Sequence, residues 1–304
     1  MKSVKNIIIV TGGAGFVGSN LILLLLKKTK LKIISLDNYS SGKKINHIEN
    51  NRVKYINGYT KNIASIFKDK KNKIKTIFHF GEFSRIYQSF LNMNECIDSN
   101  SVGTNAVFNF CLKYDIKLIY SATSASLGNK GRDKNLSPYA FTKSKNLEML
   151  ENLKKWFKMK YEIIYFYNVY GPGQIKEGAM ATVIGIFENC YKKNIPLPVV
   201  RPGTQSRRFT HITDTVNICY LAWKRNLCRH YSISNKKSYS INQVAKLFNT
   251  NSKLLPPRKG ERYASALSSF SQSNKIYRYF GSLQLKDYVR DFIKLYNNKG
   301  KFIR

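Results

Sequence analysis

The sequence predicts an α/β protein with a doubly wound parallel sheet and a second, smaller α/β lobe. Three observations predict this architecture. An early apolar run leads through a glycine-rich turn into an apolar helix, further strand-like runs alternate with helical patterns up to residue 167, and the pattern becomes loop-rich from Asn168 onward. Strands that alternate with helices form parallel sheets, because each helix packs back onto the sheet between two strands.

The first predicted strand spans Asn6 to Val10, which is almost purely apolar and β-branched. This composition is typical of a strand that is buried on both faces of a parallel sheet. Thr11 to Gly18 then forms a glycine-rich turn, and Asn20 to Leu26 is an unbroken run of apolar helix-forming residues followed by two lysines. A strand, a glycine turn and a helix in this order give meaning to a G-x-G-x-x-G pattern, which is weak on its own.

Each glycine of this turn has a physical reason. Gly12 and Gly13 permit a tight turn, Gly15 lets backbone N–H groups approach a pyrophosphate, and Gly18 lets the helix pack close to the strand. The helix N-terminus would then present unpaired N–H groups and a partial positive charge to the phosphates. The stretch therefore predicts a dinucleotide-binding turn of the Rossmann type, and the alternative is a glycine-rich turn without a ligand.

The second predicted strand, Lys32 to Leu36, ends at Asp37, which lies 19 residues beyond Gly18. A dinucleotide-binding fold places an acid at this distance, where it accepts hydrogen bonds from the adenosine ribose. A carboxylate at this position repels a 2′-phosphate, so NAD is favoured over NADP. The alternative is an ordinary turn residue at the end of a strand.

The remaining elements divide the chain into two parts. The first part, residues 1–167, is the predicted NAD-binding domain, to which residues 208–232 return, whereas residues 168–207 and 233–304 form the smaller lobe, which we expect to bind the substrate. The expected further strands are Val53–Ile56, Ile74–Phe80, Ile116–Ser121 and Tyr161–Tyr167, and the expected further helices are Ile97–Tyr114, Ser137–Lys160, Ala181–Lys193, Asp214–Arg225, Ile241–Phe248 and Leu283–Tyr296.

The chain carries a formal net charge of +35, from 52 Lys and Arg against 17 Asp and Glu. Such a surplus often indicates nucleic-acid binding. Here, however, the lysines are spread along the whole chain, and Lys, Asn and Ile are all abundant, as in proteins encoded by AT-rich genes. The densest run, Lys68 to Lys75, is interpreted as a solvated loop. We therefore expect no nucleic acid as the primary partner, although the positive field would attract an anionic substrate.

The cysteines and histidines predict neither disulfides nor a metal site. The 5 cysteines contain no C-x-x-C pair, and the 4 histidines are scattered. Apolar runs are too short for a secretory signal or for the ~20 residues that span a bilayer. These features predict a cytoplasmic protein with reduced thiols and no membrane partner.

Tyr139 and Lys143 stand four residues apart in a predicted helix, so their side chains share one face. A free tyrosine has a pKa of about 10 and is a poor base at neutral pH. A lysine one turn away, together with the positive nicotinamide ring of NAD⁺, lowers that pKa and yields a base suited to an alcohol. Ser121 to Ser124 ends the preceding strand and supplies hydroxyl groups near the tyrosine. Y-x-x-x-K alone is common by chance. It becomes specific only because it follows the glycine turn, Asp37 and the hydroxyl groups at the strand end, in that order.

Together these motifs resemble a known family. TGGAGFVGSN, DNYSSG, IFHF, N-x-x-G-T, Y-x-x-x-K, NVYGPGQ and GTQSRRF occur in order between Val4 and about Arg290. The set resembles an extended short-chain dehydrogenase/reductase and, more narrowly, the NAD-dependent nucleotide-sugar epimerase/dehydratase family, whose best-known member is UDP-glucose 4-epimerase.

The resemblance implies roles for individual residues. Thr123, Tyr139 and Lys143 match the catalytic hydroxyl, the base and the partner of the base. Asn168, Arg207 and Arg258 match residues that contact the substrate diphosphate, with Thr123 also contacting the substrate. The positions implied to contact NAD are Gly12, Gly15, Phe16, Val17, Gly18, Asp37, Asn38, Phe80, Gly81, Asn100, Ser121, Tyr139, Lys143 and Phe166, and Asn100 also matches a structural asparagine.

Several positions depart from the family pattern. Gly58-Tyr59 replaces a Gly-Asp after the third strand, and Leu127 replaces a tyrosine. The 4,6-dehydratases carry Thr-Asp-Glu where this chain has Thr123, Ser124 and Ala125. Since both acids are missing, dehydration is not expected.

The segment from Lys176 to Ala181 resembles the corresponding part of heptose 6-epimerases, which use a lysine there. An ungapped match places Glu177 on that lysine and Lys176 one residue early. The alternative interpretation is a hinge loop between the lobes.

The resemblance implies an NAD-dependent epimerase that oxidises a nucleoside diphosphate sugar transiently at C4, and a homodimer formed through the helices near residues 97–114 and 138–160. The alternatives are a 4-dehydrogenase or 4-ketoreductase, or a heptose epimerase, of the same fold. A further alternative outside catalysis is an NAD-binding or nucleic-acid-associated protein.

Overall fold

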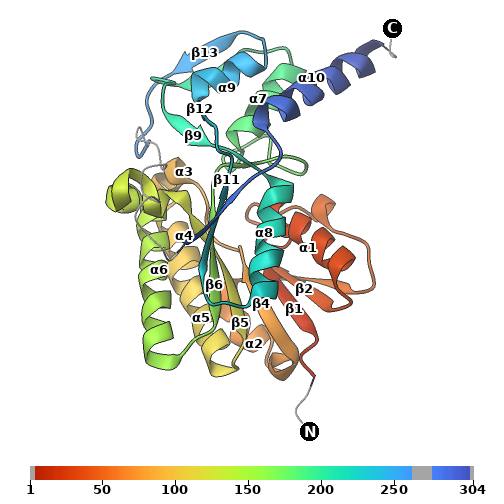
Figure 1. Cartoon of the computed structure of the whole chain (residues 1–304), viewed down its shortest axis with the longest axis vertical. Coiled ribbons are helices and arrows are strands. Elements are labelled where there is room, and N and C mark those ends of the chain that lie inside the picture. The colour runs from red at the N-terminus through yellow and green to blue at the C-terminus, as the bar shows by residue number, and fades with distance from the viewer. Residues whose placement is uncertain (1–3, 262–275, 302–304) are drawn as a thin grey trace.

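The structure is a computed structural model that describes residues 4–261 and 276–301 (Figure 1). Its main feature is a sheet of eight strands, all of them parallel. In spatial order the strands are β14 (Ile276–Phe280), β11 (His230–Ser234), β6 (Tyr161–Phe166), β5 (Lys117–Thr123), β4 (Ile74–His79), β1 (Ile7–Thr11), β2 (Lys32–Asp37) and β3 (Val53–Asn57). The chain runs outward from β1 in one direction and from β4 in the other, so the order reverses between these two strands. Ligands bind at such a switch point in open α/β sheets.

Helices cover both faces of the sheet (Figure 1). On one face, α1 (Phe16–Lys28) and α8 (Ile212–Arg225) pack on a core that includes Ile8, Val10 and Trp223. The other face carries α2 (Ile63–Ile66), α5 (Thr104–Lys113) and α6 (Pro138–Phe157) over a second core. The side chains of β1 alternate between these two cores, which explains why the whole strand is apolar.

The smaller lobe lies beyond the carboxyl ends of the strands, at the top of Figure 1. Its helices α7 (Val183–Lys192), α9 (Ile241–Leu247) and α10 (Leu285–Lys301) pack around a separate apolar core. Its short strands form three pairs, which are β7 (Val169–Tyr170) with β10 (Thr210–His211), β8 (Leu197–Val200) with β13 (Ser252–Leu255), and β9 (Ser206–Arg208) with β12 (Ser238–Ser240).

Two expectations from the sequence need correction. Strand β14 pairs with β11 in the main sheet, although residues 233–304 were expected to belong to the lobe. The helix expected over 97–114 is a run of three segments: α4 (Met93–Ile97), a π-helical stretch Asp98–Gly103, and α5. The other expected strands and helices are present with bounds that differ by a few residues. Residues 262–275 and 302–304 of the expected lobe lie outside the described residues.

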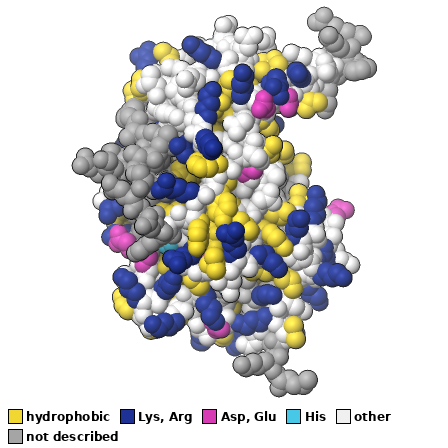
Figure 2. Space-filling model, viewed as in Figure 1, with side chains coloured by type: hydrophobic (Ala, Val, Ile, Leu, Met, Phe, Trp, Pro, Cys, Tyr) yellow, Lys and Arg dark blue, Asp and Glu magenta, His cyan; other side chains and the backbone are white. Residues whose placement is uncertain are grey.

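The surface carries the basic surplus in a dispersed form. Figure 2 shows lysine and arginine side chains scattered over both lobes of the visible face, with few acidic side chains among them. Among the described helices, none has both the length and the apolar composition required to cross a membrane.

Candidate active site

A cavity of about 900 Å³ lies between the carboxyl edge of the sheet and the smaller lobe. Every site residue that the sequence predicts lines it except Asn100. The sheet supplies the glycine turn after β1, Asp37 at the end of β2 and the segments after β4 and β5, whereas the lobe supplies β9 and the start of α7. Residues more than 240 positions apart in the chain therefore face one space.

The glycine turn has the geometry that a phosphate cradle needs. Gly12 has φ +69, a left-handed conformation that favours glycine. A Cβ on Gly18 would lie 2.1 Å from the carbonyl oxygen of Gly12, so only glycine allows α1 to start this close to β1. Gly15 precedes α1, and no side chain of the described residues caps the helix there. Free backbone N–H groups at a helix N-terminus fit an anionic pyrophosphate.

Asp37 is held ready for a hydroxyl-bearing ligand. Its side chain accepts hydrogen bonds from the backbone N–H groups of Ala14 and Tyr39, both at 2.9 Å. Burial raises the pKa of Asp37 above its ordinary value, while these two N–H groups act against that rise. A Cβ on Gly42 would lie 2.8 Å from Asp37 Oδ1, so the following loop passes directly over the carboxylate.

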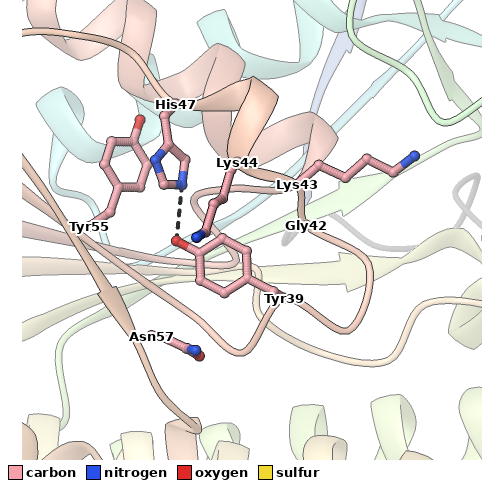
Figure 3. A pocket seen from close by; sticks show the side chains of 7 residues that line it. All are labelled: Tyr39, Gly42, Lys43, Lys44, His47, Tyr55 and Asn57. Carbon is pink, nitrogen blue, oxygen red and sulfur yellow. Dashed lines mark hydrogen bonds between the residues drawn. The ribbon is translucent and has the colours of Figure 1, made fainter.

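That loop is fastened at a second, smaller hollow of about 590 Å³ (Figure 3). The Tyr39 hydroxyl points at the His47 ring, with 2.9 Å between Oη and Nε2. The His47 ring stacks on Tyr55 with centroids 3.8 Å apart. These contacts join the loop to strand β3 and hold the end of the cavity that carries Asp37.

Asn100 lies beneath the cavity and is completely buried. Its side chain accepts a hydrogen bond from Phe83 N at 2.7 Å and donates one to Phe83 O at 3.0 Å. Asn100 belongs to the π-helical stretch, and through these bonds it holds the segment after β4 in place. The structure therefore supports the structural role for Asn100, and it does not place this residue in contact with the cavity.

Tyr139 lies in the first turn of α6, which begins with Pro138 after the capping residue Ser137. The Ser137 hydroxyl accepts a hydrogen bond from Ala140 N at 3.0 Å. The tyrosine is 9% exposed and lines the cavity. A helix N-terminus favours negative charge nearby, so this position suits a phenol that is to act as a base.

Two hydroxyl groups stand at the end of β5, beside this helix. Ser121 donates a hydrogen bond to the carbonyl of His79 at 3.0 Å, which ties β5 to β4. Thr123 ends β5, lines the cavity and accepts a hydrogen bond from Ala125 N at 3.1 Å. Within the described residues no acceptor takes the Thr123 hydroxyl hydrogen, so it can bond to a ligand.

Lys143 has a partner that the sequence reasoning missed. Its ammonium forms an ion pair with Glu82, and the side chains of Lys143 and Glu82 are 4% and 2% exposed. The same ammonium donates to the backbone carbonyl of Ser121. One signal could have identified Glu82: an acid stands directly after the apolar strand IFHFG in a chain with only 17 acidic residues.

Arg85 is a second residue that the sequence reasoning missed. It lines the cavity, and its Nε donates to the carbonyl of Met180 at 3.1 Å. Burial lowers the pKa of the Arg85 guanidinium, while its proximity to Tyr139 acts in the other direction. Arg85 thereby connects the start of α3 (Ile86–Leu91) to the loop that leads into α7.

The residues that the sequence predicts to contact the substrate also line the cavity. Arg207 on β9 forms an ion pair with Glu261 at 2.6 Å, and Arg258 lies over the ring of Tyr87 at 5.4 Å. Asn168 has a positive φ of 23 and donates to the carbonyl of Arg208 at 2.8 Å. Two guanidinium groups on one wall can bind a diphosphate through paired hydrogen bonds.

Lys176 and Glu177 do not line this cavity. Lys176 lies 2.7 Å from Glu188, and Glu177 pairs with Lys193 at 2.5 Å. Their contacts fasten the loop before α7 to that helix, as the hinge-loop interpretation expects.

Comparisons with known proteins agree with this geometry. The chain matches the model of the NAD dependent epimerase/dehydratase family over residues 8–234. It is 28% identical over 274 residues to a putative UDP-glucose 4-epimerase of Methanocaldococcus jannaschii, which covers 84% of this chain and 88% of the relative.

Solved structures share the fold. UDP-glucose 4-epimerase of Thermotoga maritima, solved with UDP-glucose, has a TM-score of 0.83 at 23% identity and covers 96% of this chain and 99% of its own. The dTDP-glucose 4,6-dehydratase DesIV of Streptomyces venezuelae, solved with NAD, also has a TM-score of 0.83, at 18% identity and with 97% and 98% covered. On the family match, the chain belongs to the NAD dependent epimerase/dehydratase family and is an enzyme that uses NAD.

Proposed function

We propose that this enzyme is a nucleotide-sugar epimerase that acts by transient oxidation at C4 of the sugar. One observation carries the proposal: Tyr139 and Thr123 face the same cavity as the glycine turn, Asp37 and the two arginines. A dinucleotide on the turn and a diphosphate on the arginines would leave the sugar in the space that the tyrosine and the threonine share.

The protein side of the reaction is proton transfer and orientation. When bound, NAD⁺ supplies a reversible acceptor for the hydride of the sugar carbon. Tyr139, as the phenolate, takes the proton of the C4 hydroxyl and later returns it, and Thr123 hydrogen-bonds the same oxygen. For the configuration at C4 to invert, the hydride would have to return to the opposite face of that carbon, so the sugar must turn over in the cavity between the two transfers.

Residues of the smaller lobe hold the diphosphate of the substrate, which is the part that the reaction leaves unchanged. Arg207 and Arg258 bind the diphosphate, and Asn168 stands at the boundary between the sheet and the lobe. Holding the diphosphate allows the sugar ring to rotate while the substrate stays bound. The broad positive field favours arrival of this doubly anionic substrate.

Dehydration is not part of the proposal. Thr123 is followed by Ser124 and Ala125, both of them buried, where a dehydratase needs an acid and a base. Without them no water is eliminated. The reaction then consists of oxidation at C4 and return of the hydride to C4, which gives the 4-epimer.

The experiment incubates the NAD-loaded enzyme with UDP-, GDP- and ADP-hexoses, follows the 4-epimers by NMR and records absorbance at 340 nm. We expect one sugar to epimerise with no net NADH. Net NADH would instead indicate a 4-dehydrogenase. Tyr139→Phe should lower kcat by at least about 100-fold. Retention of more than about a tenth of the wild-type kcat would show that Tyr139 is not the base.

We also propose a cytoplasmic homodimer. All 5 cysteines are free, as in a reducing compartment. Exposed apolar side chains lie along α6 and the helical segments beside it: Ile97, Val102, Phe141, Met149, Trp156 and Phe157. Replacing Phe141 and Met149 with serine should convert a dimer to a monomer in light scattering, whereas serine at the exposed Leu23 of α1 should not. A wild-type monomer would contradict the proposal.

A further inference from the structure

A buried carboxylate lies at the centre of the proposed site. Glu82 follows β4 and receives hydrogen bonds from every side. Its Oε1 accepts from Thr104 Oγ1 at 3.0 Å, from the Tyr120 hydroxyl at 3.0 Å and from Asn146 Nδ2 at 3.2 Å. Its Oε2 accepts from the ammonium of Lys143. Four donors thus hold the carboxylate of Glu82 in one position.

The network extends from Glu82 to the glycine turn. His79 Nε2 lies 2.9 Å from Thr104 Oγ1, and His79 Nδ1 lies 2.7 Å from Thr11 Oγ1. Because Thr104 donates to Glu82, it must accept from His79, which fixes the proton of the imidazole on Nε2. Thr11 in turn accepts from Gly81 N at 3.0 Å. Glu82 is thus fixed by β1, β4, β5, α5 and α6 together.

The ion pair with Glu82 fixes the position of the Lys143 ammonium. Lys143 Nζ is 4.7 Å from the centre of the Tyr120 ring and donates to two oxygens, those of Glu82 and Ser121. Among the contacts of the described residues this leaves one N–H of the ammonium for another acceptor. Tyr139 stands one turn earlier on the same helix face.

Three of the other titratable groups around Lys143, which are His79, Cys96 and Tyr120, are neutral near pH 7. Burial lowers the pKa of His79 to about 4 and raises that of the Cys96 thiol to about 11. The pKa of Tyr120 is raised well above its ordinary value, chiefly by burial. Beside Tyr139, Arg85 adds a positive charge. Within the described residues that face Lys143, Glu82 therefore supplies the negative charge.

Charge and burial act on Lys143 in opposite directions. Burial lowers the pKa of the Lys143 ammonium, whereas the charge of Glu82 and its hydrogen bond raise it. A buried lysine without a counter-charge loses its proton at a pH up to about 5 units below the ordinary value. A neutral lysine could no longer favour the phenolate of Tyr139.

We propose that Glu82 is a positioning residue of this enzyme: its carboxylate keeps Lys143 protonated and holds the ammonium beside Tyr139. The inference rests on the proposed role of Tyr139 and adds a residue that acts through Lys143. Glu82 needs no contact with the substrate for this role.

The test is a pH titration of the ¹³Cε resonance of Lys143 in the full chain without NAD. The resonance is assigned by its loss in Lys143→Met. In Glu82→Gln, which keeps the shape and removes the charge, we expect Lys143 to lose its proton at a pH at least about 2 units lower than in the wild type. Glu82→Asp keeps the charge and should restore most of the difference. Glu162→Gln, the same change in another buried lysine–glutamate pair, should leave the titration of Lys143 unchanged.

Turnover gives a second readout once a substrate from the panel above is known. Glu82→Gln should lose activity mainly on the alkaline side, by at least about tenfold more at pH 9 than at pH 7. A loss of equal size at every pH, without rescue by Glu82→Asp, would show a merely structural role.

The titration remains decisive if turnover is never found. An unchanged titration of Lys143 in Glu82→Gln overturns the proposal. If Glu82→Gln does not fold, the titration of Lys143 in Glu82→Asp decides the question. The proposal is overturned if Lys143 in that variant loses its proton at a pH as low as that of an unpaired buried lysine. Neither result depends on which sugar the enzyme uses, so this inference and the proposed function can fail separately.

Discussion

Two lysine–glutamate pairs in the described part of the chain have both partners buried, and they lie at opposite ends of the same strands. Lys143 and Glu82 stand at the carboxyl edge of the sheet, beside the cavity. Lys117 and Glu162 stand at the amino edge, where β5 and β6 begin. The same two charges have different surroundings at the two edges.

The amino-edge pair uses all of its hydrogen-bonding groups. Lys117 Nζ donates to Glu162 at 2.9 Å, to Asn226 at 2.7 Å and to the carbonyl of Trp223 at 3.3 Å. Glu162 also accepts from the backbone N–H groups of Cys228 and Arg229, at 3.0 and 2.8 Å. The pair joins the end of α8 to the sheet, and all three N–H groups of the Lys117 ammonium are used within the protein.

The carboxyl-edge pair is equally buried but keeps one N–H of Lys143 available, and it lines a cavity. A saturated pair specifies structure, whereas a pair with a remaining donor can act on a neighbouring group. The difference between the two edges lies in what surrounds the charges rather than in the charges themselves.

The largest expected effect is on the turnover rate, and it distinguishes the two lysine–glutamate pairs. Lys143→Met should lower kcat per folded molecule by about 10²–10⁴-fold, because Tyr139 loses its cationic neighbour. Lys117→Met removes the same charge at the other edge and should keep kcat within about twofold of the wild type. Steady-state kinetics on folded protein, verified by circular dichroism, measures both. Equal losses in the two variants would remove the functional distinction between the edges.

The next effect concerns stability. Lys117→Met leaves the carboxylate of Glu162 buried with two backbone donors only, so it should lower the free energy of unfolding by about 3–5 kcal/mol. Urea denaturation followed by fluorescence measures the change. The double variant Lys117→Met with Glu162→Leu should recover much of the loss, since no unpaired charge remains. A single variant as stable as the wild type would show that this pair does not hold the amino edge together.

The smallest effect is a pH dependence that belongs to the carboxyl edge. Burial lowers the pKa of His79 from 6.5 to about 4, so the unfolded chain binds a proton that the folded chain does not. The free energy of unfolding should therefore fall as the pH falls from 6.5 towards 4, by about 3 kcal/mol over the window. His79→Gln lacks this titration. The difference between the two pH profiles, measured by urea denaturation, isolates the histidine, and parallel profiles would contradict a buried neutral His79.

Local patterns made much of this site predictable. The glycine turn, Asp37 and the pair of Tyr139 and Lys143 each depend on spacing within one strand–helix unit, where sequence distance fixes geometry. Their place in one cavity follows from the rule that the carboxyl ends of parallel strands meet at one edge. The division into a sheet and a smaller lobe was a separate prediction, made from the loop-rich pattern that begins at Asn168.

The acid after the apolar strand IFHFG could have drawn attention to Glu82, but its pairing with Lys143 was not predictable because the contact spans 61 residues. Nothing in the segment after β4 states that an ammonium from α6 will reach it. The π-helical stretch Asp98–Gly103 interrupts a helix that the sequence pattern predicts as continuous, and the side chain of Asn100, bonded to Phe83, faces inward there. Strand β14 is short and half-exposed, so its sequence lacks the apolar signature of a central strand.

The way the lobe core closes has a consequence for the order of events during synthesis. Leu285 and Val289 are completely buried within that core, next to helices that precede them by 40 to 100 residues. A nascent chain that has emerged only as far as β11 can complete the two layers around the first seven strands of the sheet. It cannot close the lobe over the cavity until α10 has left the ribosome. The growing polypeptide could thus acquire its dinucleotide cradle before the smaller lobe can enclose a substrate, which places substrate capture after cofactor binding.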